Sequence, residues 1–460
     1  MRCWLPLSLL ALAAAAADAA IINTSVKRLV DLTKHVVRIQ SDIQFVNDDA
    51  DTSVYEFALS KRMSERLAFV SAKCGKIACE VVKADHDHGD DSDVGLYSVV
   101  LQDSVPKGET GHVKLTSYFT RVLTPFPAEV AQTDEQLVVF EDTHVMPSPY
   151  LTRTQTTKVK LPSGRIESYS DVAPVTHKGS VVTYGPYENA EPFVAPRNAL
   201  RVHFKNHSPF MTVTSLVKEI EVSMWGRVSV EEVYDLLHTG AKLKGGFSRF
   251  DYTAKGARGA SFHELRASLP REAVNVYYRD QIGNVSTSRL RVTDTRQELE
   301  FKPRFPLFGG WKTQWYLGYS VPTYAVMTRQ GTTFKLEMDF STSLEDAAVD
   351  DLTLKVILPE GSTNVQVSVP FAVDEQRRTT RQTYLDTALV GRPVVVLSKR
   401  NVVAAHNAPI QVTFEYAPAF MLHEPLLLVA GFLAFFVVCM ALFRCDVRLV
   451  KPKASKKKTE

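Results

Sequence analysis

One uninterrupted apolar stretch near the C-terminus constrains this chain more than any other feature. Residues 426–443 read LLLVAGFLAFFVVCMALF, without a charged side chain. A helix of that length just crosses a hydrocarbon core of about 30 Å. A buried core helix is the alternative, but the charges on either side of the stretch favour a membrane span. We therefore predict one transmembrane helix over residues 423–443.

The charges flanking this stretch are asymmetric. The residues before it are His423, Glu424 and Pro425, whereas the tail after it, residues 444–460, is strongly basic. Its basic residues are Arg444, Arg448, Lys451, Lys453, Lys456, Lys457 and Lys458. Because positive charge is retained on the cytosolic side, we expect the tail in the cytosol and the rest of the chain in the lumen.

The N-terminus predicts entry into the secretory pathway. Arg2 precedes an apolar run from Leu5 to Ala17, and the small residues of Ala17-Asp18-Ala19 resemble a cleavage site. The run is shorter than the ~20 residues that a span requires, which disfavours the alternative of an uncleaved anchor. We predict a signal peptide at 1–19 and a single-pass, type I protein of the endoplasmic reticulum membrane.

Two lysines near the carboxyl end bear on location. Lys457 and Lys458 occupy the fourth and third positions from the end, the register of a dilysine retrieval signal for the endoplasmic reticulum. The alternative is a basic tail that attracts anionic lipid headgroups. The same lysines can serve both purposes.

Only two cysteines fall between the signal and the membrane. Cys74 and Cys79 are separated by a Gly-containing turn, a spacing that a local disulfide can close in an oxidising compartment. A zinc site would need further ligands, and a redox site would favour Cys-x-x-Cys. We expect the structural disulfide.

Short segments with two-residue periodicity dominate the region between signal and anchor, as expected for strands with one buried face. The clearest lie at residues 37–45, 113–119, 334–340, 352–358, 365–369 and 410–414. We predict a mainly β (α+β) chain with two tandem antiparallel β-sandwich-like domains, 20–208 and 209–422. No internal repeat is evident.

One helix is predicted within the second domain. Ser229 and Glu232 have the spacing of a capping box, and Gly240 suits the end of a helix. At helical spacing, Val230, Val233, Tyr234 and Leu237 share one face.

Nothing in the sequence identifies a catalytic, cofactor-binding or metal-binding residue. The formal net charge of +3 is concentrated in the tail and gives no indication of nucleic-acid binding. The acidic and histidine-rich run at 85–93 contains metal-compatible side chains, but such runs are usually solvated loops. Dispersed carboxylates that meet only in the fold remain an open route to sugar chemistry.

Three sequons for N-glycosylation lie in the expected lumenal region, at Asn23, Asn206 and Asn284. Asn23 lies beside the signal cleavage site, and proline follows the Asn206 sequon. We therefore rank Asn284 first and Asn206 and Asn23 as weaker candidates.

Several segments form a set of ordered motifs. The clearest are residues 277–288 (YYRDQIGNVSTS) and 303–312 (PRFPLFGGWK), supported by 239–252, 184–187 (YGPY) and 424–427 (EPLL). Together these segments resemble the ribophorin I family. The resemblance implies a subunit of the oligosaccharyltransferase complex, which transfers a preassembled oligosaccharide from dolichyl diphosphate to Asn-x-Ser/Thr of nascent chains. In that family the chemistry belongs to a separate multi-span subunit.

The resemblance therefore implies a non-catalytic subunit that stabilises the complex and helps to hold acceptor chains. Its expected partners are the multi-span catalytic subunit, other subunits, nascent polypeptides and membrane lipid, with the translocon as a further candidate. Phe305, Leu307, Phe308 and Trp311 form an aromatic run suited to a subunit contact, with core packing as the alternative. For a contact residue, Trp311→Ala would weaken assembly with little change in unfolding temperature.

Two other functions fit the same architecture. A lumenal binding module, such as a chaperone or cargo receptor, would also need a signal, sandwiches and one anchor. Co-purification with a multi-span partner distinguishes a transferase subunit from such a module. A lumenal enzyme acting on sugars would be recognised by unaided sugar release or transfer.

Overall fold

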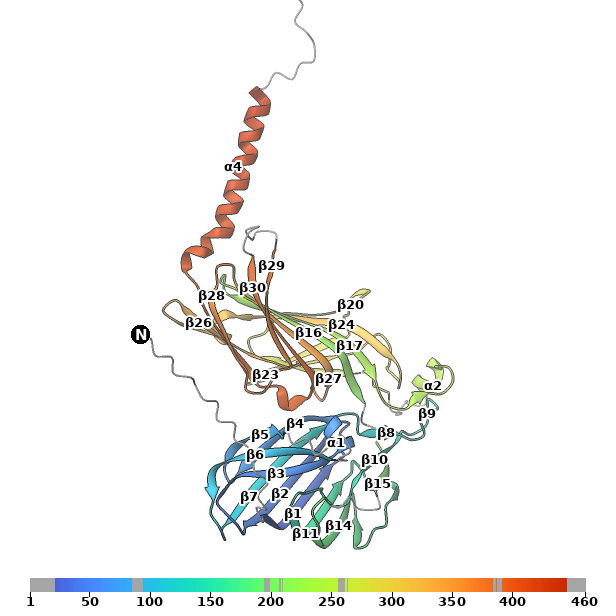
Figure 1. The fold of residues 1–460 in the computed structure, drawn as a ribbon. Coiled ribbons are helices and arrows are strands. Elements are labelled where there is room, and N and C mark those ends of the chain that lie inside the picture. Colours follow the sequence, from blue (N-terminus) through green and yellow to red (C-terminus); the bar gives the residue numbers. More distant parts are fainter. Residues whose placement is uncertain are drawn as a thin grey trace, which may run out of the picture.

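The computed structural model describes residues 21–84, 94–193, 199–206, 208, 210–254, 261–262, 264–383, 386 and 391–444. Strands dominate these residues, and the long helix α4 (His423–Arg444) extends from one end of the molecule (Figure 1). At 1.5 Å per residue its 22 residues span about 33 Å. No side chain of α4 is buried. The predicted mainly β fold with one membrane-length helix is confirmed.

The buried side chains form two large clusters that divide the chain. One cluster begins at Ile21 and ends at Phe210, and the other begins at Met211 and ends at Tyr416. We call the corresponding parts the N-terminal body (residues 21–210) and the C-terminal body (residues 211–416). We propose that they correspond to the domains expected at 20–208 and 209–422.

The N-terminal body pairs a ten-stranded sheet, in the order β13-β14-β11-β1-β2-β7-β4-β5-β6-β3, with a four-stranded sheet, β12-β15-β10-β8. Its elements are β1 (Ile21–Asp31), β2 (Val37–Asn47), β3 (Thr52–Ser60), α1 (Lys61–Arg66), β4 (Leu67–Cys74), β5 (Ile77–Lys83), β6 (Val94–Val105), β7 (Thr110–Phe119), β8 (Leu123–Pro125), β9 (Glu129–Val130), β10 (Leu137–Thr143), β11 (Leu151–Lys160), β12 (Ile166–Tyr169), β13 (Val175–Lys178), β14 (Val181–Ala190) and β15 (Ala199–Lys205).

The C-terminal body contains an eight-stranded sheet, β21-β20-β24-β17-β16-β27-β30-β29, a three-stranded sheet, β19-β23-β22, and a four-stranded sheet, β25-β26-β31-β28. Its elements are β16 (Met211–Ser223), β17 (Arg227–His238), β18 (Lys242–Leu243), α2 (Arg249–Ala254), β19 (Leu265–Pro270), β20 (Val274–Asp280), β21 (Gly283–Asn284), β22 (Ser288–Val292), β23 (Arg296–Phe301), β24 (Lys312–Pro322), α3 (Thr323–Val326), β25 (Met327–Gln330), β26 (Thr333–Asp339), β27 (Ala348–Ile357), β28 (Thr363–Ser368), β29 (Glu375–Arg381), β30 (Arg392–Val402), the 3-10 helix η1 (Ala404–His406) and β31 (Pro409–Glu415), followed by the 3-10 helix η2 (Pro418–Leu422) and α4.

Both bodies are built around the same arrangement of five strands, although the sequence shows no repeat. The order β14-β11-β1-β2-β7 in one body corresponds to β30-β27-β16-β17-β24 in the other. In each body, the strand that comes first in the chain (β1 or β16) pairs antiparallel with the following strand (β2 or β17). It also pairs parallel with a much later strand (β11 or β27). A parallel pair requires a long crossover, which the intervening strands provide. Apart from these two pairs and the short β9–β18 pair, the described strands pair antiparallel.

The helix predicted from Ser229 is wrong, because these residues form strand β17. Burial alternates strictly along β17, so that every second residue faces the core. Val230 and Tyr234 are buried as expected, but Glu232 lies between them on the same face. A charged residue at a core position conceals the two-residue period and leaves a pattern that also fits a helix.

Glu232 is tolerated in the core because the neighbouring strand supplies its partner. Lys218 on β16 lies directly opposite Glu232 on β17, and both side chains are almost completely buried. Their charged atoms are 3.1 Å apart. The pairing joins two residues that are not adjacent in sequence, so local pattern alone does not reveal it.

The two bodies contact each other through a polar and aromatic interface. Asn401 of the C-terminal body accepts a bond from the Thr120 hydroxyl (2.6 Å) and donates to the Leu67 carbonyl (3.2 Å). The ring of His406 contacts Phe69 edge-on, with centroids 5.0 Å apart. His406 Nδ1 accepts a bond from the Val403 backbone N–H, so its role requires the neutral ring.

This interface predicts a loss of stability in mild acid. Burial lowers the pKa of His406 to about 4, whereas the unfolded chain would bind a proton near pH 6.5. The contribution of neutral His406 to the free energy of unfolding is therefore complete above pH 6.5 and is lost as the pH falls towards 4. From pH 7.5 to 5.0 we expect the full-length chain to lose about 2 kcal/mol of stability through His406.

Thermal unfolding of wild type and His406→Gln at the two pH values measures this effect. Burial also lowers the pKa of His35 to about 4. The variant therefore retains the part of the pH dependence that is due to His35. Equal pH dependence in both proteins would contradict the assignment to His406.

Candidate interaction surface at the junction of the bodies

Two of the segments that carry the family resemblance pack against each other. Phe308, from residues 303–312, is buried against the rings of Phe247 and Tyr252, with centroids 5.7 and 6.0 Å away. Trp311 completes the group at 5.3 Å from Phe308 and 5.9 Å from Phe247. Residues separated by sixty positions in the chain thus form one aromatic cluster.

Two glycines allow the backbones of these segments to approach. A Cβ atom on Gly309 would lie 1.8 Å from the carbonyl oxygen of Ala241, so no larger residue fits there. Gly310 adopts φ +83°, a left-handed conformation that favours glycine, and its N–H donates to the His238 carbonyl at 2.8 Å. The Gly-Gly pair therefore fixes the loop against β17 and β18.

The same region joins the two bodies. The side chain of Gln132 accepts a bond from the Ser248 N–H (2.8 Å) and donates to the Ser248 carbonyl (2.9 Å). Gln136 accepts a bond from the Ala241 N–H at 2.8 Å, and β9 pairs parallel with β18. We call this region the junction. Its residues are therefore required for the relative placement of the bodies as well as for local packing.

The structure divides the predicted contact residues into two kinds. Leu307 and Phe308 are buried, Leu307 in the core of the C-terminal body and Phe308 within the aromatic cluster, so we expect them to act in packing rather than in direct contact with another subunit. Phe305 is 42% exposed and Trp311 is half-buried. Phe250 on α2, which lies within a resemblance segment, is 78% exposed. We call Phe247, Phe250, Phe305 and Trp311 the aromatic surface.

A groove of about 530 Å³ adjoins Phe305 and is lined also by residues of the third resemblance segment, 277–288. The exposed Ile282 also lines this groove, and Arg304 donates two hydrogen bonds to the carboxylate of Asp280. The guanidinium of Arg304 lowers the pKa of Asp280, which keeps the pair charged. Apolar rings beside a charged rim are typical of protein contact surfaces.

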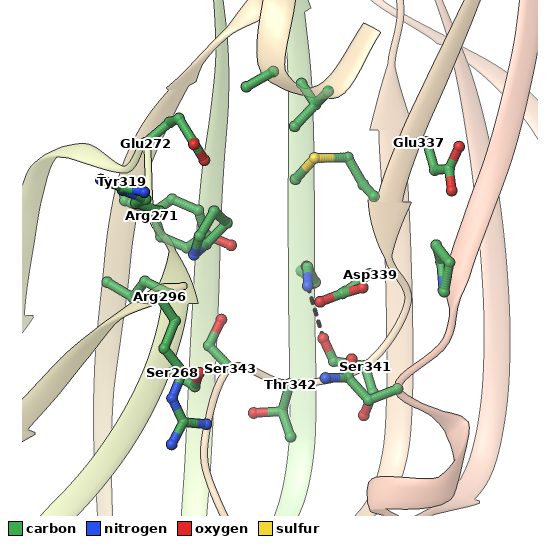
Figure 2. A pocket seen from close by; sticks show the side chains of 18 of the residues that line it. Ser268, Arg271, Glu272, Arg296, Tyr319, Glu337, Asp339, Ser341, Thr342 and Ser343 are labelled. Atoms are coloured by element: carbon green, nitrogen blue, oxygen red, sulfur yellow. Dashed lines mark hydrogen bonds between the residues drawn. The ribbon is translucent and has the colours of Figure 1, made fainter. Parts of the chain in front are cut away.

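A larger groove, of about 900 Å³, lies between the β19–β20 turn and the start of β23 on one side and β26 on the other (Figure 2). Arg271, Glu272 and Arg296 line one wall, and Glu337 and Asp339 line the other. Its lining mixes both signs of charge, so it offers no focused field for a phosphate or for a cation.

Lys218 of the buried Lys218–Glu232 pair lines this groove. Lys218 Nζ donates to the Ser341 carbonyl at 2.7 Å, the bond drawn dashed in Figure 2. Glu232 accepts bonds from the Tyr234 hydroxyl and from both the N–H and the hydroxyl of Ser343. Burial, followed by the Glu232 charge, raises the pKa of Tyr234 well above its usual value. With its oxygens so occupied, Glu232 is suited to holding strands together rather than to moving a substrate proton.

The other predicted site residues are distributed across the molecule. Cys74 and Cys79 are joined by a disulfide that closes the β4–β5 hairpin, with Cα atoms 6.0 Å apart. Lys457, Lys458 and the run at 85–93 lie outside the described residues. Within the described ranges, no group of three or more His, Cys, Asp or Glu side chains is placed to hold a metal ion.

The three sequons differ in accessibility. Asn23 and Asn206 are buried, and the Asn23 amide donates to Ser148 and Thr152. We therefore expect neither to carry a glycan in this fold, because a sugar on either amide nitrogen would displace the surrounding packing. Asn284 is exposed, and only its carbonyl oxygen is bonded, to Arg279 at 2.6 Å.

We expect Asn284→Gln to abolish glycosylation of this chain, because among the three sequon asparagines Asn284 is exposed whereas Asn23 and Asn206 are buried. Electrophoretic mobility with and without endoglycosidase measures the change. Asn206→Gln is the matched control and should leave the glycosylated band in place. Persistence of the enzyme-sensitive band in Asn284→Gln would contradict the prediction.

The model of the Ribophorin I family matches residues 21–443, which include both bodies, the junction and nearly all of α4. This chain belongs to the ribophorin I family. The resemblance segments at the junction are thus part of a match that extends over the whole described chain.

Several curated ribophorin I relatives are similar over most of their length. Dolichyl-diphosphooligosaccharide--protein glycosyltransferase subunit 1A of Arabidopsis thaliana is 39% identical over 97% of this chain and 74% of the relative. Subunit 1B of the same plant is 39% identical over 95% of both. Subunit 1 of Caenorhabditis elegans is 37% identical over 92% of this chain and 72% of the relative.

Proposed function

We propose that this ribophorin I protein is a non-catalytic subunit of the oligosaccharyltransferase complex of the endoplasmic reticulum membrane. The observation that carries the proposal is the family match over residues 21–443, together with relatives named as subunit 1 of this glycosyltransferase. The chain stabilises the complex and helps to hold acceptor polypeptides for N-glycosylation. Its partners are the multi-span catalytic subunit, other subunits, nascent chains and membrane lipid, with the translocon as a further candidate.

The chemistry of the described residues supports an accessory role. The buried carboxylate of Glu232 is occupied by Lys218, Tyr234 and Ser343. These bonds commit the carboxylate to holding neighbouring segments of the C-terminal body together.

Two surfaces are suited to subunit contact. The side chains of α4 are apolar and exposed, so they are available to other membrane helices and to lipid. The aromatic surface at the junction presents Phe250 and Phe305 to solvent, beside the charged groove at Arg304 and Asp280. Aromatic and arginine side chains are enriched at such contacts.

Depletion of the chain tests the function. We expect underglycosylation across many unrelated glycoproteins, measured as site occupancy by mass spectrometry, and recovery on re-expression. The re-expressed chain should co-purify in mild detergent with a multi-span partner. A defect confined to one client would instead indicate a cargo receptor, and sugar transfer by the purified chain alone would overturn the non-catalytic assignment.

Orientation is tested separately. We expect both bodies in the lumen and the basic tail in the cytosol. Protease added to sealed microsomes should then remove only an epitope fused to the tail, until detergent opens the vesicles. Digestion of the bodies in intact vesicles would reverse the proposed orientation.

A further inference from the structure

The membrane helix is held on the C-terminal body by fixed ion pairs. Arg392, at the start of β30, contacts Glu424 in the first turn of α4 at 3.0 Å and Glu221 at the end of β16 at 2.7 Å. The Arg392 side chain is only 13% exposed, whereas Glu424 and Glu221 are 33% and 43% exposed, so both pairs are partly buried. The beginning of α4 therefore keeps a defined position relative to β16.

Apolar packing restrains the segment before α4 in the same way. Phe420 in η2 lies over Gly361, where a Cβ atom would come within 2.6 Å of the ring. Gly361 has φ +83°, so both the close approach and the backbone conformation favour glycine. Met421 packs against the core of the C-terminal body. The body and the helix thus form one unit at this end.

Exposed aromatic side chains from two other segments gather at the same end. Trp225, in the turn between β16 and β17, is 60% exposed and lines a small cavity together with Phe420. Tyr324 on α3 is 81% exposed, and the Thr323 N–H beside it donates to the carbonyl of Gly226 at 3.1 Å. We call Trp225, Tyr324, Phe420 and Leu422 the juxtamembrane rim.

We propose that the juxtamembrane rim inserts into the boundary between headgroups and acyl chains of the leaflet next to the bodies. Helix α4 is about 33 Å long, only slightly longer than a hydrocarbon core of about 30 Å. The residues just before α4 therefore lie at headgroup level. Trp225 borders the same cavity as His423 and Glu424 at the start of α4 and therefore lies at a similar depth.

Lipid is the partner that fits the chemistry of the rim. Tryptophan and tyrosine are enriched where the membrane meets water, because an apolar ring and a polar N–H or O–H suit that boundary. The rim is continuous with the exposed apolar surface of α4, which begins at Leu426. It gives the chain a second membrane contact, from the body itself, that sets the tilt of the bodies over the bilayer.

Photocrosslinking in the assembled complex, in native membranes, tests the proposal. The substitution Trp225→p-benzoylphenylalanine should form adducts with phospholipid upon illumination, detected by mass spectrometry of the full-length chain. Phe432→p-benzoylphenylalanine, within α4, is the positive control. Phe250→p-benzoylphenylalanine, on the exposed helix α2 at the junction, is the matched negative control.

Lipid adducts at positions 225 and 432, but not at 250, would support insertion. Adducts of position 225 with protein alone, or no adduct there while position 432 labels lipid, would overturn it.

A second readout uses the full-length chain in nanodiscs containing brominated lipid. Bromine near the headgroups should quench wild-type tryptophan emission, and Trp225→Phe should remove most of that quenching, since Trp315 is buried and Trp311 lies at the opposite end of β24 from Tyr324. Equal quenching in both proteins would also overturn the proposal. Neither readout depends on glycosylation activity, so both separate this inference from the proposed function.

Discussion

Replacing Lys218 with methionine is expected to lower the free energy of unfolding of the C-terminal body by about 3–5 kcal/mol. Lys218 and Glu232 are almost completely buried, and removal of the ammonium leaves a carboxylate without its charge partner in the core. Burying an unpaired charge is among the costliest single changes a protein can undergo. Thermal unfolding of the full-length chain in detergent, monitored by tryptophan emission, measures the loss.

Two variants make this prediction specific. Lys355→Met removes one of the two partners of Glu219 on the partly exposed face of the same sheet, leaving Arg381, and should cost about 1 kcal/mol or less. The double variant Lys218→Met/Glu232→Leu removes both buried charges and should recover much of the stability lost in the single variant. Similar unfolding temperatures for Lys218→Met and Lys355→Met would contradict the importance of the buried pair.

The largest effect at the junction is expected for Leu307→Ala, which should lower stability by about 2–5 kcal/mol. Leu307 has no exposed surface, so truncation leaves a cavity beside residues of the C-terminal core. Phe305→Ala, two residues away, should leave the unfolding temperature nearly unchanged because its ring is partly in solvent. It should instead reduce co-purification of other subunits with the full-length chain.

The paired measurement separates packing from subunit contact. Unfolding temperature and recovery of partner subunits are determined for both variants under the same detergent conditions. Loss of partners in Phe305→Ala without loss of stability supports the aromatic surface as a contact. Normal recovery of partners in Phe305→Ala would remove Phe305 from the proposed interface.

Trp311 is placed for both packing and subunit contact. This modifies the expectation that Trp311→Ala would weaken assembly with little change in unfolding temperature. Its ring is half-buried and contacts Phe247, Phe305 and Phe308. Trp311→Ala is therefore expected to lower stability as well as assembly, so Phe305 is the better test of contact.

Local patterns predicted the strands well where they were complete. The segments at 37–45 and 352–358 alternate with one exception each, Ser41 and Ile357, and both lie in strands with alternating burial. The pattern failed at β17, where Glu232 occupies a core position. Local reasoning also did not distinguish the exposed Phe305 from the buried Leu307, because the sequence of an aromatic loop does not indicate which of its side chains face the core.

The sequence by itself determined the membrane helix, the β-rich class and the family resemblance. These follow from hydrophobic length, two-residue periodicity and ordered motifs, which need no information about distant residues. Tertiary structure alone decided that Lys218 neutralises Glu232, that resemblance segments meet at the junction and that Asn23 and Asn206 are buried. It also revealed the common five-strand arrangement of the two bodies. Each of these depends on which distant strands become neighbours, and that choice is made by the packing of the whole chain.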